Sequence, residues 1–484
     1  MKKLILTLIV LACQSSTCKE ITQTQKMVTI CKVWGFLKYY HPNVASGKFN
    51  WDEQLFAVLP MVEKASTKEQ FSTVLENWID SLGEIKKITL IKDSDSTTYF
   101  YKNLDLAWIK MDNVFSKNVS SKLQFIKDNR CQGKQFYVYI ELNEDNASNG
   151  IKIQNEIRYP EFNWSNIQYR ILTLFRYWNI IEYFYPNKYL MSQKWDVSLN
   201  IIISKFLYCE SEVQFHNSVY ELISLITDSH SFYFPEYKGN LIGNNFLPVE
   251  FKFIDNQIVV TKILNDSLAK INDVQLGDAI LSINKKSVSD VIYENRTNVF
   301  GSNNAAYLRN LVLKYRRFIN DTIDIDFIRE KKIQSKIVKL YKSSDFFRDL
   351  RKNKTPKYEI ISNKIVYVNM GEKLDNVLDE IKLKLLNTQA VIFDLRNYPK
   401  SAATNEIARV AINSDRPYAI STSPDLSFPS RFIWSKPFVI ESLKNFGYVI
   451  EYCGFSNNSY ILYVSLYLNF AFLFLKMISA KSIT

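Results

Sequence analysis

The stretch VWGFLKYYHPNVASGKFNWDEQL, from Val33 to Leu55, occurs a second time in this chain in diverged form. The second copy reads YWNIIEYFYPNKYLMSQKWDVSL and runs from Tyr177 to Leu199. The copies align without a gap, since 178 − 34 and 195 − 51 both give an offset of 144. The identical pairs are Trp34 with Trp178, Tyr39 with Tyr183, Pro42 with Pro186, Asn43 with Asn187, Trp51 with Trp195, Asp52 with Asp196 and Leu55 with Leu199. An ungapped match of this kind predicts a duplication.

Both copies predict helices. In each, an apolar helical face runs into a proline, Pro42 or Pro186, and a proline ends a helix. A further helix follows, in which Phe71 and Phe215 keep the same offset. The aromatic side chains favour core packing over a platform for sugars or peptides. Two copies are too few for a solenoid, so we expect a duplicated helical unit. The first copy with a connecting region covers residues 21–150, and the second covers 151–240.

The composition is that of a globular protein with several domains. The 484 residues are 47% hydrophobic and 14% aromatic, which is enough to build real cores. The net charge is +12, but the lysines are spread along the chain among acidic and amide residues. No basic stripe or binding motif accompanies the charge, so no nucleic-acid partner is expected.

Residues 1–20 are typical of an export signal. Lys2 and Lys3 precede the apolar run LILTLIVLA, which is too short to span a bilayer. The order VLAC, ending at Cys13, resembles a bacterial lipobox, in which the cysteine becomes the lipidated first residue. Plain secretion and membrane attachment through a lipidated Cys13 both stay open. The sequence predicts an exported protein, either a periplasmic or outer-membrane lipoprotein or a secreted one.

The remaining cysteines predict neither a metal site nor a redox motif. They show no C-x-x-C spacing and are Cys18, Cys31, Cys131, Cys209 and Cys453. Pairing of some of them in an exported chain is an alternative, but buried free thiols are the favoured interpretation. No cofactor and no metal are expected.

The hydrophobic period becomes that of strands over residues 244–335. QIVVTKIL is typical of a strand, DSLAKI of a short helix, and GDAILSIN of a turn followed by a strand. GDAILSIN resembles the GD-x-I-x-x-I-N signature of PDZ domains, which pair the extended C-terminus of a peptide with a strand edge. The resemblance implies a peptide-binding module, with a spacer that binds nothing as the alternative. It assigns no individual peptide-binding residues.

Residues 356–450 begin with a strand, helix and strand. The strands are NKIVYVNM and AVIFDL, and EKLDNVLDEIKLKLLN between them has one apolar helical face. This order predicts a βαβ unit with parallel pairing. Asp394 and Arg396 fall where the second strand ends, which is where open α/β sheets place their sites. A salt bridge that only fastens the strand end is an equal alternative.

The order of a helical unit, a PDZ-like module and a βαβ unit with DLRNYP resembles the tail-specific, or C-terminal processing, serine peptidases. YWNIIEYFYP (Tyr177 to Pro186) and FIWSKP (Phe432 to Pro437) look like exported bacteroidetal members, and the resemblance spans about Ile30 to Tyr448. The tricorn-like branch has a catalytic Ser-His pair ahead of the PDZ domain. The resemblance implies that His230 is the general base, that Ser229 orients it, and that the substrate is a polypeptide.

The chain also departs from this family. The oxyanion stretch, with Arg396, Asn397 and Tyr398, lacks the family's glycine pair, which puts backbone donors at Tyr398 or Lys400 in doubt. His230 belongs to the second copy alone, because the offset of 144 places Lys86 at its position and Glu84 at that of Asp228.

Beyond FIWSKP the family has a Ser-x-Ala-Glu-like turn that holds the nucleophile, and this chain has none. Ser456, Ser459 and Ser465 lie in no such context, within a divergent apolar segment over 451–484. A truncated or frame-shifted product is the favoured explanation, ahead of a membrane segment over Tyr460 to Leu475 and a true pseudopeptidase. We expect a multi-domain α+β protein with a duplicated helical unit, a PDZ-like β-rich domain and an incomplete α/β peptidase core. As printed, the chain is expected not to hydrolyse peptide bonds.

Overall fold

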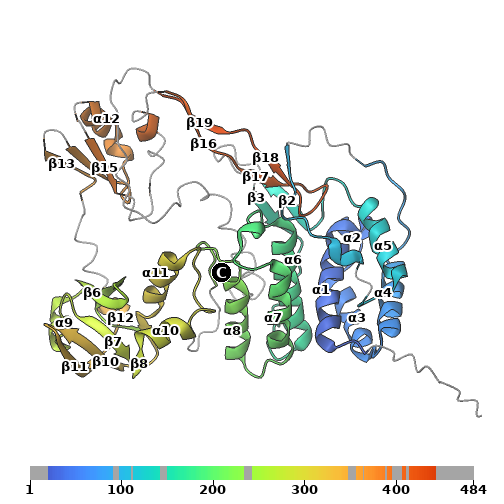
Figure 1. The fold of residues 1–484 in the computed structure, drawn as a ribbon, viewed down its shortest axis with the longest axis horizontal. Helices are drawn as coiled ribbons and strands as arrows, with labels where there is room; N and C mark the ends of the chain where they lie inside the picture. The colour runs from blue at the N-terminus through green and yellow to red at the C-terminus, as the bar shows by residue number, and fades with distance from the viewer. Residues whose placement is uncertain are drawn as a thin grey trace, which may run out of the picture. The chain divides into compact units, whose positions relative to one another are not determined.

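The computed structural model describes residues 20–90, 98–110, 113–141, 150–233, 243–346, 356–362, 365–386, 388, 390–394, 400, 406–409 and 414–442. Helices and strands are mixed along the chain, as the predicted α+β class requires (Figure 1). The chain divides into two compact units. The first is Met1–Lys92 with Asp105–Phe136, and the second is Asp93–Leu104 with Tyr137–Thr484.

The first unit is helical, and its longest helix is buried on all sides. This helix, α1, begins at a capping box in which Thr22 and Gln25 exchange hydrogen bonds, and it ends where Pro42 follows His41. The helices are α1 (Gln23–Tyr40), α2 (Pro42–Ala45), α3 (Trp51–Lys64), α4 (Lys68–Ser81), the 3-10 helix η2 (Ala107–Lys110) and α5 (Lys117–Asp128).

The second unit contains the other helical copy. Its buried helix α6 ends at Tyr185, directly before Pro186, as α1 ends before Pro42. The helices are α6 (Ile167–Phe184), the 3-10 helix η3 (Lys188–Leu190), α7 (Trp195–Leu207) and α8 (Glu212–Ser224). Short strands accompany them, namely β1 (Tyr99–Phe100), β2 (Val138–Glu141) and β3 (Gly150–Ile153).

The repeated tryptophans have the same environment in both copies. Trp34 Nε1 donates to the carbonyl of Trp51 at 3.2 Å, and Trp51 Nε1 returns a bond to the carbonyl of Trp34 at 3.1 Å. Trp178 and Trp195 make the same exchange at 3.3 and 3.0 Å. The two pairs also stack, with ring centroids 6.3 and 6.1 Å apart. Each pair joins the long helix of its copy to the helix that begins at the second tryptophan, which is α3 in the first copy and α7 in the second.

A buried cation also recurs at one position of each copy. Lys26 Nζ donates to the carbonyls of Glu63 and Ala65, at the end of α3. Arg170, which is 144 positions further on, donates in the same way to the carbonyls that end α7. These carbonyls have no partner within their own helix, so the cation closes the helix end.

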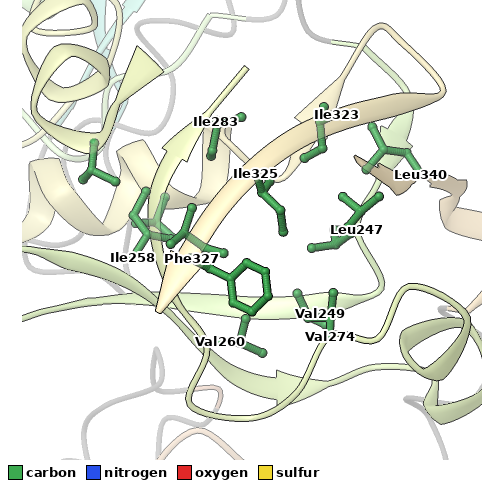
Figure 2. Close-up of a cluster of buried hydrophobic side chains, with 14 residues drawn as sticks. Leu247, Val249, Ile258, Val260, Val274, Ile283, Ile323, Ile325, Phe327 and Leu340 are labelled. Carbon is green, nitrogen blue, oxygen red and sulfur yellow. The ribbon is translucent and has the colours of Figure 1, made fainter. Parts of the chain in front are cut away.

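The strand-rich module of the second unit is built on a six-stranded sheet. Along the sheet the strands run β11, β10, β7, β6 and β5, with β8 paired to β7. Figure 2 shows the core, in which Phe327 lies among aliphatic side chains such as Val249, Val260 and Ile325. The strands are β5 (Val249–Ile254), β6 (Gln257–Ile263), β7 (Ala279–Ile283), β8 (Lys286–Ser287), β10 (Thr322–Arg329) and β11 (Lys332–Lys339).

Helices and a second small sheet complete this module. The helices are α9 (Asp266–Ile271), α10 (Val288–Glu294) and α11 (Asn304–Lys314), and α11 packs against β5. The small sheet consists of β12 (Tyr341–Lys342), β4 (Asn245–Phe246) and β9 (Arg317–Phe318), and the 3-10 helix η4 (Ser343–Asp345) follows β12. The strand expected from QIVVTKIL and the helix expected from DSLAKI are both present as β6 and α9.

The βαβ unit has the predicted parallel pairing. Strand β14 pairs with β15 from Ile365 opposite Ala390 to Asn369 opposite Asp394, and α12 lies between them in the chain. Its bounds are β13 (Tyr358–Ser362), β14 (Ile365–Asn369), the 3-10 helix η6 (Asp375–Val377), α12 (Leu378–Leu386) and β15 (Ala390–Asp394). The later strands are β16 (Arg416–Ala419), β17 (Thr422–Pro424), β18 (Phe432–Trp434) and β19 (Phe438–Ile440).

The segment that contains FIWSKP is tied to the end of α6. Strand β18 lies between β1 and β17 in a three-stranded sheet. Ser430 donates its backbone N–H to the carbonyl of Tyr183 at 2.9 Å and its hydroxyl to the carbonyl of Glu182 at 3.0 Å. Arg431 forms a buried ion pair with Asp425. Residues that are distant in sequence therefore support the helix end that leads to Tyr185.

Several predictions fall outside the described residues. They concern the export signal with Cys13, the glycine-poor stretch at 395–399 and the apolar segment at 451–484. Among the residues that are described, no helix combines the length and the hydropathy needed to cross a membrane.

Candidate functional site

His230 is bonded to an aspartate two residues earlier in the chain. Its ring Nδ1 lies 3.0 Å from Asp228 Oδ1, and its backbone N–H donates to the same oxygen at 2.9 Å. The side chain of His230 is 28% exposed and that of Asp228 only 13%. The carboxylate is therefore mostly enclosed, while the imidazole still reaches solvent.

Local backbone geometry places these two residues. Helix α8 ends when the N–H of Leu225 bonds to the carbonyl of Glu221. Thr227 then takes a φ of +55°, in the left-handed region that β-branched residues rarely adopt. Asp228 begins a turn that the N–H of Ser231 closes on its carbonyl, and an aspartate commonly opens a turn by accepting from the backbone two residues on. The turn brings the imidazole back over the carboxylate that precedes it.

The Asp228 and His230 pair sets the charge and the tautomer of the imidazole. The hydrogen bond to Asp228 raises the pKa of His230 above its usual 6.5, and burial opposes this effect. Burial alone would raise the pKa of Asp228, but the hydrogen bonds from His230 hold it below its usual value. A carboxylate can only accept, so Nδ1 carries the proton of the neutral ring. Nε2 is then the nitrogen that can take up a proton.

A second histidine holds the end of the loop that follows His230. His216 on α8 is buried, and its Nδ1 lies 2.6 Å from the hydroxyl of Tyr233. Tyr220 donates its hydroxyl to the carbonyl of Tyr233 at 3.0 Å. Burial lowers the pKa of His216 to about 4, so this ring is neutral near pH 7. The loop that carries His230 is thus held at both ends.

Ser229, the predicted orienting partner, makes different contacts in the structure. Its hydroxyl accepts from the N–H of Ser302 at 2.9 Å, and its own N–H donates to the Ser302 hydroxyl at 2.8 Å. The two hydroxyls are 2.9 Å apart. We call this reciprocal contact the Ser229–Ser302 clasp. The group bonded to the imidazole is Asp228, so the orienting role that the family resemblance gives to Ser229 stays a prediction.

Sequence reasoning passed over two residues of this site. Asp228 was compared with Glu84 through the repeat, but its spacing of two from His230 was the signal for a bond to the ring. Tyr185, whose hydroxyl donates to Asp228 Oδ2 at 3.0 Å, is 43 residues away from it. No local pattern links residues so far apart.

The strand that leads to the predicted oxyanion stretch is described as far as Asp394. Arg396, Asn397 and Tyr398 lie outside the described residues. Asp394, at the end of β15, accepts from the hydroxyl of Tyr367 at 2.5 Å, and its carbonyl accepts from the N–H of Met370. If His230 is a base, it should lie on the side of the helical unit that faces the end of the AVIFDL strand, and this stays a prediction.

The described residues hold no group of three or more histidine, cysteine or acidic side chains suited to a metal ion. Cys31 is fully buried, while Cys131 and Cys209 are half-buried thiols. Burial raises the pKa of the Cys131 thiol. This keeps the thiol protonated, which makes it a poor nucleophile.

The comparisons with known proteins give distant structural likenesses. No family model matches the chain, and no curated protein matches it in sequence. A crystal structure of a CPAF mutant is similar over 54% of this chain, with a TM-score of 0.39 and 15% identity. The photosystem II D1 C-terminal processing protease is similar over 58% of this chain and 73% of its own, with a TM-score of 0.28 and 11% identity. This chain spans 61% of the length of the CPAF chain.

Proposed function

We propose that this chain is an exported protein of the tail-specific serine peptidase type that engages polypeptides, with His230 as its general base. One observation carries the proposal, namely the 3.0 Å contact between Asp228 Oδ1 and His230 Nδ1 at the position of the family's Ser-His motif. An acceptor on Nδ1 with Nε2 left open is the arrangement by which a histidine takes a proton from a nucleophile. The duplicated helical unit then serves as the support for this loop.

The proposal does not extend to catalytic turnover by the chain as printed. A serine peptidase needs a nucleophile, a base and an oxyanion hole, and removal of the nucleophile leaves only a small residual acceleration. The serines at 456, 459 and 465 lie in no nucleophile motif, and the family's glycine pair is absent after Arg396. We therefore expect binding of polypeptides without cleavage.

A direct test uses the purified 484-residue chain with an unfolded protein substrate and a fluorophosphonate probe. No cleavage and no labelled serine are expected. Labelling of one serine, together with cleavage that is lost in His230→Ala, would show that the chain is an active peptidase and that the expectation of inactivity is wrong. His230→Ala incubated with the substrate and without the probe measures the background rate of cleavage.

A second candidate function is peptide binding through the strand-rich module. Strand β5 lies at one end of the six-stranded sheet, with α11 packed beside it. An end strand has backbone groups that an extended peptide can pair with. Two arginines follow α11, and Arg317 belongs to β9, which pairs with β4 just ahead of β5.

Charge favours a peptide with a free C-terminus at this end of β5. Burial lowers the pKa of Arg316, and Glu250 on β5 is the acidic residue close enough to oppose that effect. Arg316 Nε is buried and has no hydrogen-bond partner among the described residues. A carboxylate placed between this guanidinium and the start of β5 would satisfy that donor.

This candidate is tested on the full chain with peptides that differ only in a free or amidated C-terminus. We expect the free carboxylate to bind more tightly and Arg316→Gln to remove that preference. Arg309→Gln, which neutralises an exposed arginine on α11 itself, is the matched control. Equal binding of both peptides to the unmodified chain would reduce the module to a spacer.

A further inference from the structure

The carboxylate of Asp228 is held at both of its oxygens. Oδ1 receives the two bonds from His230, and Oδ2 accepts from the hydroxyl of Tyr185 at 3.0 Å. A carboxylate bonded through one oxygen can rotate about its Cβ–Cγ bond. A donor at the second oxygen fixes its plane, because the two sets of bonds must be satisfied together.

Tyr185 is itself fixed by contacts on its backbone. It caps the end of α6, with its N–H bonded to the carbonyl of Ile181, and it is 6% exposed. Asn103 donates its side-chain amide to the carbonyls of Tyr185 and Pro186, at 3.3 and 2.6 Å. The amide oxygen of Asn103 accepts from the N–H of Tyr189 at 3.0 Å. Asn103 is 1% exposed, so it is a buried clamp on the turn that begins at Tyr185.

We propose that Tyr185 is a positioning residue for His230: its hydroxyl, aimed by the Asn103 clamp, holds Asp228 so that the imidazole keeps its proton on Nδ1 and leaves Nε2 open. This inference rests on the proposed role of His230 as a base and adds the group that maintains it. Tyr185 does not touch the reacting atoms in this account. It acts through Asp228.

The first copy indicates that Tyr185 serves this site rather than helix packing. The offset of 144 places His41 at the position of Tyr185, and Glu84 and Lys86 at those of Asp228 and His230. Glu84 and Lys86 are exposed, and His41 accepts at Nδ1 from the N–H of Asn43. In the first copy, therefore, the helix ends before its proline without a tyrosine at this position. The tyrosine is present only in the copy that also has the Asp228 and His230 pair.

Another phenol lies near the same carboxylate. Tyr177 on α6 is fully enclosed, and burial together with the negative charge of Asp228 raises its pKa, so it stays neutral. Among the described residues, the group that raises the pKa of His230 is Asp228, through its hydrogen bond and its charge, and burial opposes it. A change in the pKa of His230 reports the state of Asp228.

The experiment is a side-chain ¹⁵N NMR titration of the full chain labelled at histidine. The sequence has three histidines, and burial lowers the pKa of His41 and of His216 to about 4. Both stay neutral above about pH 5, so the ring that titrates above that pH is His230, whose pKa is raised above its usual 6.5. The ¹⁵N shifts also distinguish the Nδ1–H tautomer from the Nε2–H tautomer.

Three variants are compared with the unmodified chain. Tyr185→Phe removes the hydroxyl and keeps the ring, and we expect the pKa of His230 to fall toward 6.5 and the Nδ1–H tautomer to lose population. Asn103→Ala is expected to act in the same direction because it releases Tyr185. Tyr208→Phe removes the same atom from an exposed tyrosine and is expected to change nothing.

An unchanged or raised pKa of His230 in Tyr185→Phe would overturn the inference. The resonances of His216, whose ring contacts Tyr233, show whether the helical copy is still folded. If Tyr185→Phe disturbs the His216 resonances, the test is made with Asn103→Ala, in which an unchanged or raised pKa of His230 would likewise overturn the inference. Failure of the base proposal looks different, since the unmodified chain would then lack the Nδ1–H tautomer altogether.

Discussion

Replacing the buried cation of each helical copy by methionine should cost unequal amounts of local stability. Arg170 and Lys26 occupy equivalent positions, and both are 5% exposed. Arg170 donates four hydrogen bonds to carbonyls, at 2.7 to 3.0 Å, whereas Lys26 donates two, at 2.8 and 2.9 Å. Methionine has a similar length and no donor, so Arg170→Met and Lys26→Met remove the bonds with little loss of packing.

The expected cost follows from which carbonyls are buried. The bonds of Arg170 to Phe206 and Leu207 are buried, while those to Trp164 and Ser165 are partly exposed and water can replace them. A hydrogen bond from a charged donor contributes about 1.5–3 kcal/mol, so Arg170→Met should cost about 3–6 kcal/mol. Lys26 has one buried and one partly buried bond, and its loss should cost about 1.5–3 kcal/mol on the same scale.

Amide hydrogen exchange measured by mass spectrometry suits this prediction, because it reports local opening in a chain of several domains that does not unfold in one step. Arg170→Met should speed exchange in the last turn of α7, and Lys26→Met should do so in the last turn of α3. Arg170→Lys is the matched control. It leaves a cation like that of the first copy and should lie between the unmodified chain and Arg170→Met.

The reasoning would be refuted if Arg170→Met left exchange in α7 unchanged. It would also fail if Lys26→Met destabilised its helix end more than Arg170→Met does. In either case the carbonyls at these helix ends would find other partners, and the buried cations would be tolerated rather than stabilising.

Trp51→Phe and Trp195→Phe each remove one N–H bond of a reciprocal pair. Both should therefore cost about 2–4 kcal/mol of local stability, measured by hydrogen exchange. Clearly unequal costs would contradict equivalent packing of the two pairs. Ser302→Ala removes the Ser229–Ser302 clasp, whose hydrogen bonds are exposed, so it should cost under about 1 kcal/mol of stability. It should also speed amide exchange in residues 228–233. Unchanged exchange there would mean that the clasp does not hold the loop. The pKa of His216 is about 4 in the folded protein against a usual 6.5, so the unfolded state takes up the proton first. The stability that the neutral ring contributes to the second helical copy should therefore be lost as the pH falls from about 6.5 to about 4. His216→Gln should flatten this loss, and a pH dependence equal to that of the unmodified chain would argue against it.

Much of the helical arrangement could be predicted from the sequence. Trp34 and Trp51 are 17 residues apart and repeat as Trp178 and Trp195, so the match itself indicated a shared contact. The proline after each long helix marked its end, because a proline cannot continue the hydrogen-bond ladder. The parallel pairing of β14 and β15 followed from a helix between two apolar strands.

The contacts that complete the site could not be predicted in this way. Tyr185 meets Asp228, and Asn103 meets Pro186, only because separate elements pack together. Polar residues at such distances carry no periodic signal. The resemblance to a Ser-His motif drew attention to Ser229, while the carboxylate just before it is the group that contacts the ring.

The most direct test of the account compares the pKa of His230 in the unmodified chain and in Asp228→Asn, by the histidine ¹⁵N titration. The asparagine keeps the shape of the side chain but removes the carboxylate, whose hydrogen bond and charge raise the pKa of His230. Because the folded pKa is raised, the stability from this pair is complete below the usual 6.5 and is lost as pH rises through the folded value. The account predicts an Nδ1–H ring that titrates above 6.5 in the unmodified chain and lower in Asp228→Asn. Equal pKa values in the two proteins would contradict the claim that Asp228 orients and charges His230.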